Sequence, residues 1–304
     1  MHINLLLRNT VNTKPDHLKR SVGSNDPISP CDKNAVMPDS RSFYYPFITF
    51  GKKENSEKLN LPEKIQQEDP ELIKELHNAL GEIEKSILNV NFDSPTFHFG
   101  LPLNEDGKIE IPENKEFEND LNTIIKIIPE FKESIGNKQN PTHKYTRDIH
   151  ILRVLQEVVK NENYKNLPEN DKKIAKLFAL MHDIEKEKEH VDPSHPLKSS
   201  IKANIILQRL DFHPKDRIKI VNLVRNHHWL AELNSAQNPD IDSKVSEFSK
   251  IGNFDIVKIF SEADLRSIND SFYDYKFETS KYSNKDALKV FSAEIQKRIK
   301  TNFM

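Results

Sequence analysis

Apolar residues recur every three or four positions over most of the chain after residue 69, which is the spacing of amphipathic helices. The first such segment, 69–89, follows the helix-start signal Asp69-Pro70. From about residue 119 the pattern predicts one helix after another, and Pro196 and Pro214 each stand where a first turn begins. The predicted helices of this second part are 146–161, 174–181, 197–210, 215–231, 243–251, 255–268 and 285–300.

One internal segment departs from the helical pattern. Residues 96–103 and 108–111 flank the turn Asn104-Glu-Asp-Gly107 and alternate between apolar and polar positions, which predicts a small β-hairpin. Pro102 would keep its strand at an edge, because proline cannot donate a ladder hydrogen bond. The predicted fold class is therefore all-α, with a small β-hairpin insertion.

The first 65 residues differ from the rest of the chain. They hold several prolines among polar residues and show no sustained period, so we expect a mostly disordered leader. Residues 43–50, Phe-Tyr-Tyr-Pro-Phe-Ile-Thr-Phe, are the exception. This segment is either a docking segment on the body of the protein or a partner-binding motif.

Composition narrows the functional classes. A net charge of -2 gives no general attraction to nucleic acid or anionic membranes, so neither is expected as a partner. Cys31 is the single cysteine, which excludes an intrachain disulfide, and no apolar run approaches the ~20 residues of a membrane-spanning helix. The first residues lack the features of a cleaved signal peptide. We expect a cytoplasmic protein, and secretion without a cleaved signal peptide is compatible with the sequence.

Several histidines and aspartates lie on or at the ends of predicted helices whose other face is apolar. If those faces share one core, the side chains converge on one pocket, and neutral imidazole with carboxylate suits divalent ions such as Fe, Mn, Zn or Mg. His182 and Asp183 anchor the set, because adjacent polar residues cannot both be buried without partners. The alternative is a His182 that caps the helix beside a solvated Asp183. The set is His150, His182, Asp183, His195, His227, His228 and Asp264.

Short motifs in the second half of the chain form an ordered series. His143-Lys-Tyr-Thr-Arg-Asp-Ile-His150 is followed by Met181-His-Asp-Ile-Glu-Lys186, Val224-Arg-Asn-His-His-Trp229 and Glu262-Ala-Asp-Leu-Arg-Ser-Ile-Asn269. In order and spacing, over roughly residues 121–275, they resemble the uridylyl-removing domain of bacterial PII uridylyltransferases. That domain belongs to the HD superfamily of metal-dependent phosphohydrolases. The first motif differs from that of the family at one position, where this chain has Arg147 and the family has valine.

The resemblance implies an HD-type helical bundle that holds one or two divalent ions, with Mn, Fe, Mg, Zn and Co not distinguished. Asp183 would bridge the two ions where both are present. Family alignment favours His227 over His228 as a ligand, whereas helix geometry alone does not choose between them. The implied metal ligands are His150, His182, Asp183, His195, His227 and Asp264.

Further roles are implied for residues around these ligands. Lys186 would bind the substrate phosphate as a point charge and, with Asp183, would be catalytic; the alternative is a lysine in a solvated charged run. His143 and Asp148 would orient the ligands, or else belong to the start of a helix. Arg266 would orient a ligand or bind phosphate, or else form a surface salt bridge.

Two local departures from the family accompany the resemblance. Glu185 stands where the family has a small residue, so its carboxylate could repel a phosphate or contact a metal. The segment from Asp183 to His195 is longer, so it could enlarge or cover the pocket mouth. We expect the hydrolytic module alone, because the flanking segments have no room for the family's other domains. The expected parts are the leader 1–65, a helix and hairpin extension 66–120, the HD domain 121–275, and a C-terminal helix within 276–304 that packs on it.

We therefore predict a stand-alone phosphohydrolase in which a metal-activated water cleaves a phosphomonoester or phosphodiester. The substrate would be a nucleotide, another small phosphate ester or a nucleotidylated protein. One alternative is a catalytically weak sensor that binds metal and nucleotide. The other is an all-α interaction protein that retains the HD fold.

Overall fold

The computed structural model describes residues 70–302, so the predictions for the leader and for residues 43–50 lie outside the described part. The described residues form helices joined by turns, and they contain no β-strand. This confirms the all-α class. All of these residues belong to one compact unit.

The helices follow the predicted segments, with ends that shift by a few residues. Pro196 and Pro214 stand at the starts of two helices, because the first turn needs no hydrogen bond from their missing amide hydrogen. The α helices are α1 (Pro70–Ser86), α2 (Lys115–Ile127), α3 (Arg147–Lys160), α4 (Glu162–Lys165), α5 (Glu169–Met181), α6 (His195–Arg209), α7 (Pro214–Arg225), α8 (Trp229–Ser235), α9 (Ile241–Ser249), α10 (Phe254–Ile268) and α11 (Asn284–Asn302). The 3-10 helices are η2 (Ile87–Asn89), η3 (Pro95–Phe97) and η4 (Pro129–Ser134).

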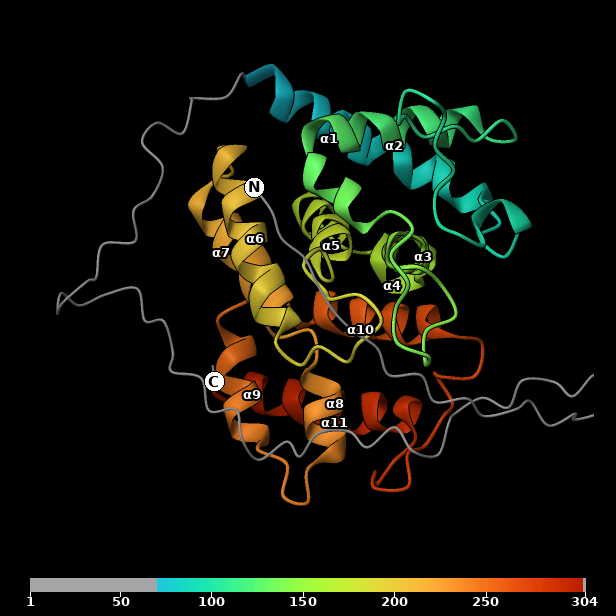
Figure 1. The fold of residues 1–304 in the computed structure, drawn as a ribbon. Coiled ribbons are helices and arrows are strands. Elements are labelled where there is room, and N and C mark those ends of the chain that lie inside the picture. The colour runs from blue at the N-terminus through green and yellow to red at the C-terminus, as the bar shows by residue number, and fades with distance from the viewer. Residues whose placement is uncertain (1–69, 303–304) are drawn as a thin grey trace, which may run out of the picture. The chain divides into compact units, whose positions relative to one another are not determined.

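Helices α3, α5 and α10 form the centre of the core, where α3 packs on both α5 and α10 (Figure 1). Every residue of α5 from Ile174 to Met181 is buried, including Lys176. The Nζ atom of Lys176 lies 2.7 Å from Oε2 of Glu84, and the hydroxyl of Tyr164 donates to the same oxygen at 2.8 Å. These contacts satisfy a buried ammonium group that would otherwise be costly, and they tie α1 and α4 to α5.

Other helices flank this centre. Helices α1 and α2 pack against each other at one end, the α6–α7 hairpin packs on α5 along one side, and α11 packs across α8, α9 and α10 at the other end (Figure 1). The C-terminal helix thus packs on part of the segment 121–275. Among the described residues, no helix is both long and apolar enough to cross a membrane.

The predicted single helix 215–231 is wrong, because the chain breaks at residues 226–228 between α7 and α8. The side chain of Trp229, directly after the break, is fully buried and donates from Nε1 to Oγ of Ser261 at 2.8 Å. Nδ1 of His227 lies 2.7 Å from the carbonyl oxygen of Val224. The break therefore lets Trp229 enter the core while His227 turns toward a separate polar cluster.

The predicted β-hairpin is present only as its turn. One isolated antiparallel bridge, between Leu103 and Ile109, closes the turn 104–107. Beyond this bridge the amide of Glu110 donates to the carbonyl of Pro102 at 3.1 Å, but Pro102 and Pro112 have no amide hydrogen with which to continue the ladder. The structure therefore does not confirm two strands in this part of the described chain.

Substitution of Gly100 by alanine is expected to lower the free energy of unfolding by about 2–4 kcal/mol. Gly100 has a φ of +101°, and an added Cβ would lie 2.6 Å from the backbone nitrogen of Gly136. Gly81→Ala is the matched control, because a Cβ at that position in α1 meets nothing within 4 Å. Alanine should stabilise that helix by about 0.5–1 kcal/mol. Urea unfolding of both variants checks this, and equal effects would contradict the close approach at Gly100.

Candidate metal centre

Side chains from distant parts of the chain meet between α3, α5, α6 and α10. Except for Asp264, which is partly exposed, all of them are buried. Helix ends supply most of them, because a side chain at a helix end can leave the packed face of that helix. The six are His150 in α3, His182 and Asp183 directly after α5, His195 at the start of α6, His227 between α7 and α8, and Asp264 in α10.

Three of these residues form a first group that could hold a metal ion. One ligand atom from each of His150, His182 and Asp264 lies within 4.8 Å of the others. The two Nε2 atoms are 3.3 Å apart. Oδ1 of Asp264 lies 3.2 Å from Nε2 of His150 and 3.9 Å from Nε2 of His182. These atoms can surround a cation with only small movements.

A second group that could hold a metal ion contains His195, His227 and His228, whose ligand atoms also lie within 4.8 Å of one another. The Nε2 atoms of His195 and His227 are 3.1 Å apart. The ring of His228 meets both neighbouring rings edge-on, with centroids 4.5 Å away. His227 also approaches Asp183, with Nε2 3.6 Å from Oδ1. The geometry thus makes His227 the ligand candidate that also faces Asp183, and it places His228 beside it.

The carboxylate of Asp183 stands between the two groups. Its Oδ2 lies 3.6 Å from Nε2 of His150 and 3.5 Å from Nε2 of His182. Its Oδ1 lies 2.9 Å from Nε2 of His195 on the other side. One carboxylate can therefore contact both positions, which is the bridging arrangement that the resemblance implies.

Backbone carbonyls orient the four histidine rings. Nδ1 of His182 lies 2.8 Å from the carbonyl oxygen of Ala179, and Nδ1 of His150 lies 3.2 Å from that of Ser267. His195 and His227 direct Nδ1 in the same way to the carbonyls of Asp192 and Val224. Each Nδ1 therefore donates its hydrogen to a carbonyl, which leaves Nε2 as a lone pair directed inward.

The distances between these Nε2 atoms indicate whether a cation fits between them. Two Nε2 atoms without hydrogens repel each other at 3.1–3.3 Å, unless a cation or a proton lies between them. Oδ1 of Asp183 is also buried, and no donor meets it with hydrogen-bond geometry. A divalent ion in each group would satisfy both the imidazoles and this carboxylate oxygen. The donor set therefore fits two divalent ions.

Burial and charge give these groups the protonation states that metal binding needs. Burial lowers the pKa of His182 to about 3 and also lowers the pKa of His195, so both rings are neutral at pH 7. Burial by itself would raise the pKa of Asp183, but the ammonium group of Lys186 holds it well below its usual value. Neutral imidazoles and ionised carboxylates bind metals.

Lys186 belongs to this centre and not to a solvated charged run. Its side chain is buried, and Nζ lies 2.7 Å from Oδ2 of Asp183. Nζ also lies 3.2 Å from Nε2 of His143. Burial, aided by Lys186, holds the pKa of His143 well below its usual value, so a neutral ring accepts from the ammonium group. His143 thus orients Lys186, and its ring also meets that of His150 edge-on.

Two of the sequence candidates lie away from the metal ligands. Arg266 pairs with Glu262 at 2.8 Å and lies over the ring of Tyr273, which is the contact expected of the surface salt-bridge alternative. The buried Asp148 accepts from the amide of Leu101. It therefore fixes the segment between η3 and α2, and its hydrogen bond goes to backbone and not to a metal ligand.

Around the predicted ligands, the structure adds contacts that motif reasoning missed. Glu185 forms an ion pair with Lys202 at 2.7 Å, so its carboxylate is engaged outside the ligand cluster. The carbonyls that orient His182, His195 and His227 each belong to the residue three positions earlier. A histidine next to a helix end was the available sequence signal for this geometry, although sequence alone does not show the ring orientation.

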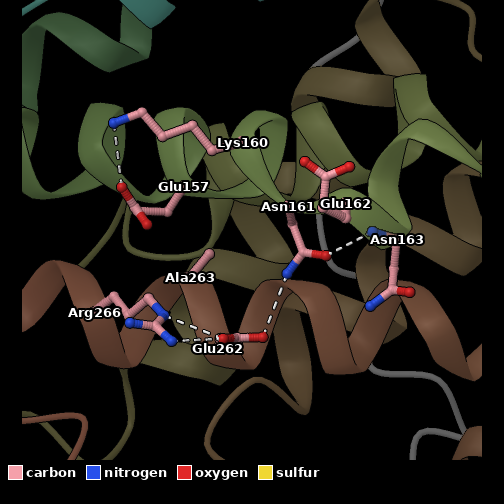
Figure 2. Close-up of a pocket in the computed structure, with 8 residues that line it drawn as sticks. All are labelled: Glu157, Lys160, Asn161, Glu162, Asn163, Glu262, Ala263 and Arg266. Carbon is pink, nitrogen blue, oxygen red and sulfur yellow. Dashed lines mark hydrogen bonds and ion pairs between the residues drawn. The ribbon is translucent and has the colours of Figure 1, made fainter.

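Two cavities in the described part of the chain lie away from these ligands. Figure 2 shows the first, with a volume of about 340 Å³, between α3, α4 and α10. There Arg266 and Asn161 both contact Glu262, and Lys160 pairs with Glu157. The second, of about 400 Å³, shares Glu262 and Asn161 with the first and extends to α11. Glu262 stands two positions from Asp264, on another side of α10, so these cavities do not open on the histidine cluster.

Comparison of the chain with protein-family models, with curated proteins and with solved structures found no match. The resemblance to the HD superfamily therefore rests on the motifs alone. The metal centre rests on its own geometry.

Metal-loaded protein is expected to retain about two Mn²⁺ or Zn²⁺ ions per chain after gel filtration, measured by elemental analysis. Asp183→Ala should remove most of this metal, because it deletes the oxygens that face both groups. His190→Ala is the control, since His190 is an exposed histidine of the same segment. Equal metal loss from both variants would contradict the assignment.

Acidification of the metal-free protein is expected to reduce its free energy of unfolding as the pH falls from about 6.5 toward 3. Burial lowers the pKa of His182 to about 3, so the unfolded chain binds a proton that the folded chain does not. This contribution is fully present above pH ~6.5 and is lost below it, by up to about 1.4 kcal/mol per pH unit. His182→Gln should flatten that slope in urea unfolding with a chelator present. An unchanged slope would mean that the folded imidazole already carries the proton.

Proposed function

We propose that this chain is a metal-dependent phosphohydrolase of the HD type, active on a phosphomonoester or phosphodiester. The observation that carries this proposal is the convergence of four inward Nε2 atoms on the two oxygens of one buried carboxylate, Asp183. A site built from neutral imidazoles and carboxylates suits a pair of divalent ions. Bound there, such ions supply Lewis acidity for a phosphoryl oxygen and for the attacking water.

The surrounding residues would divide the work of binding and orientation. Asp183 keeps the two groups of ligands together, and the backbone carbonyls keep each imidazole turned inward. Lys186 supplies the nearest described ammonium group, in contact with Asp183. Its charge would bind a phosphoryl oxygen of the substrate once that oxygen competes with the carboxylate. His143 would hold the ammonium group in place through Nε2.

The proposed substrate is a nucleotide, another small phosphate ester or a nucleotidylated protein. Support comes from the Met181–Lys186 motif, whose histidine, aspartate and lysine stand together at the centre. The chain's small net negative charge also favours such substrates over long nucleic acids.

A second candidate function is a metal-binding sensor with weak catalysis. The burial of the centre favours a sensor, because a substrate would have little access to His182, Asp183 and His195, which are 0–2% exposed. The two cavities described above also lie on another side of α10. A sensor would bind metal and ligand without turnover, so a hydrolysis assay on metal-loaded protein separates the two functions.

Hydrolysis of p-nitrophenyl phosphate, bis-p-nitrophenyl phosphate or a member of a nucleotide panel is expected with Mn²⁺-loaded protein. Asp183→Ala should abolish turnover, and Lys186→Met should lower kcat/KM by about 10- to 100-fold, because a charge-assisted contact with phosphate is lost. Arg266→Gln is the control and should retain activity, since Arg266 pairs with Glu262 at the surface. No turnover by the loaded wild-type protein on any ester would overturn the proposal and favour the sensor.

A further inference from the structure

Arg147 is a buried arginine that joins two separate segments beside the metal centre. Its side chain is 6% exposed. One terminal nitrogen donates to the carbonyl of Lys186, and the other donates to the carbonyl of Glu133. Its own amide donates to the carbonyl of Asn137 at 2.8 Å. Arg147 therefore ties the turn after α5 to the end of η4.

The choice of arginine at this position needs a physical reason. A buried guanidinium group is costly unless its donors are satisfied, and the partners of Arg147 are neutral carbonyls while its Nε has no partner. An apolar residue would fill the same place more cheaply, and valine occupies this position in the resembled motif. Simple packing therefore does not account for arginine here. Two directed hydrogen bonds account for it, and the nearby carboxylates of Asp183 and Glu185 offset part of the cost of burying the charge.

The contacted carbonyl belongs to the lysine of the proposed phosphate site. The amide of Lys186 donates to the carbonyl of Asp183 at 3.1 Å, and its carbonyl accepts from Arg147. Both backbone groups of Lys186 are thus held while its side chain reaches Asp183 and His143. A second contact between the same two segments, from the amide of Glu189 to the carbonyl of Lys138 at 3.1 Å, lies further from the lysine.

We propose that Arg147 is a positioning residue, which fixes the backbone of Lys186 so that its ammonium group reaches the phosphate of the substrate. This inference rests on the proposed function. A lysine side chain has four rotatable bonds, so its terminal position is defined only if its backbone is held and its partners are in place. The hydrogen bonds of the Arg147 side chain go to backbone carbonyls and not to the side chains of the metal ligands.

Amide hydrogen exchange of the full, metal-loaded chain tests the backbone part of this role. Arg147→Val, which introduces the residue of the resembled motif, should accelerate exchange in peptides that cover 183–188. Arg209→Val is the matched control, because Arg209 also donates to a backbone carbonyl, that of Ile127, and pairs with Glu130. The control should leave exchange at 183–188 unchanged.

Phosphate binding tests the part that a purely structural role would not affect. Calorimetric titration with inorganic phosphate should show binding about 10-fold weaker in Arg147→Val, with unchanged metal content, because the lysine is less well placed. Arg147→Lys keeps the charge but offers a single nitrogen, so it should recover only part of the binding. That variant keeps the test decisive if the valine variant does not fold.

The outcomes separate this inference from the proposed function. Unchanged exchange at 183–188, loss of metal, or full recovery of phosphate binding by lysine would each overturn the positioning role. If the wild-type protein binds metal and phosphate but hydrolyses no ester, the proposed function fails. In that case the exchange and phosphate results still decide whether Arg147 positions Lys186 for an anion.

Discussion

The architecture of the centre depends on a single buried carboxylate, that of Asp183, which meets imidazole nitrogens on both of its oxygens. A buried carboxylate is costly unless charge or hydrogen bonds compensate it. Lys186 compensates one oxygen, whereas the other has no donor with suitable geometry. This imbalance is what a bound cation would remove, and it explains why histidines from four separate parts of the chain point their lone pairs at one residue.

The helical fold serves this arrangement mainly through its helix ends. A side chain in mid-helix shares the direction of its neighbours one turn away, whereas a residue at a helix end can turn out of the packed face. His182, His195 and His227 use that freedom, and each directs Nδ1 to the carbonyl three residues earlier. Only His150 and Asp264 come from helix interiors, on the two helices α3 and α10 that pack together at the centre.

Sequence alone predicted the helices well because their stability depends on periodic burial, which the pattern records. It also identified the residues that converge, since each is a metal-ligating type at a helix or helix end. It failed at residues 226–228, where the helical period continues but the burial of Trp229 and the carbonyl contact of His227 break the helix. It left the roles of Arg266 and Asp148 open, because the direction in which a polar side chain points depends on its tertiary partners, such as Leu101 for Asp148.

The start of α3 shows why motif resemblance and chemical role need separate arguments. Three residues of this motif, His143, Asp148 and His150, lie close together in sequence, but their side chains contact different parts of the structure. His150 faces the ligand cluster, His143 accepts from Lys186, and Asp148 binds the backbone of Leu101 on another side of the helix. Asp148 can therefore be retained in such a motif for the fold alone. The departing residue, Arg147, contacts the backbone of the candidate phosphate-binding lysine, so a mismatch to the motif can still bear directly on the chemistry of the site.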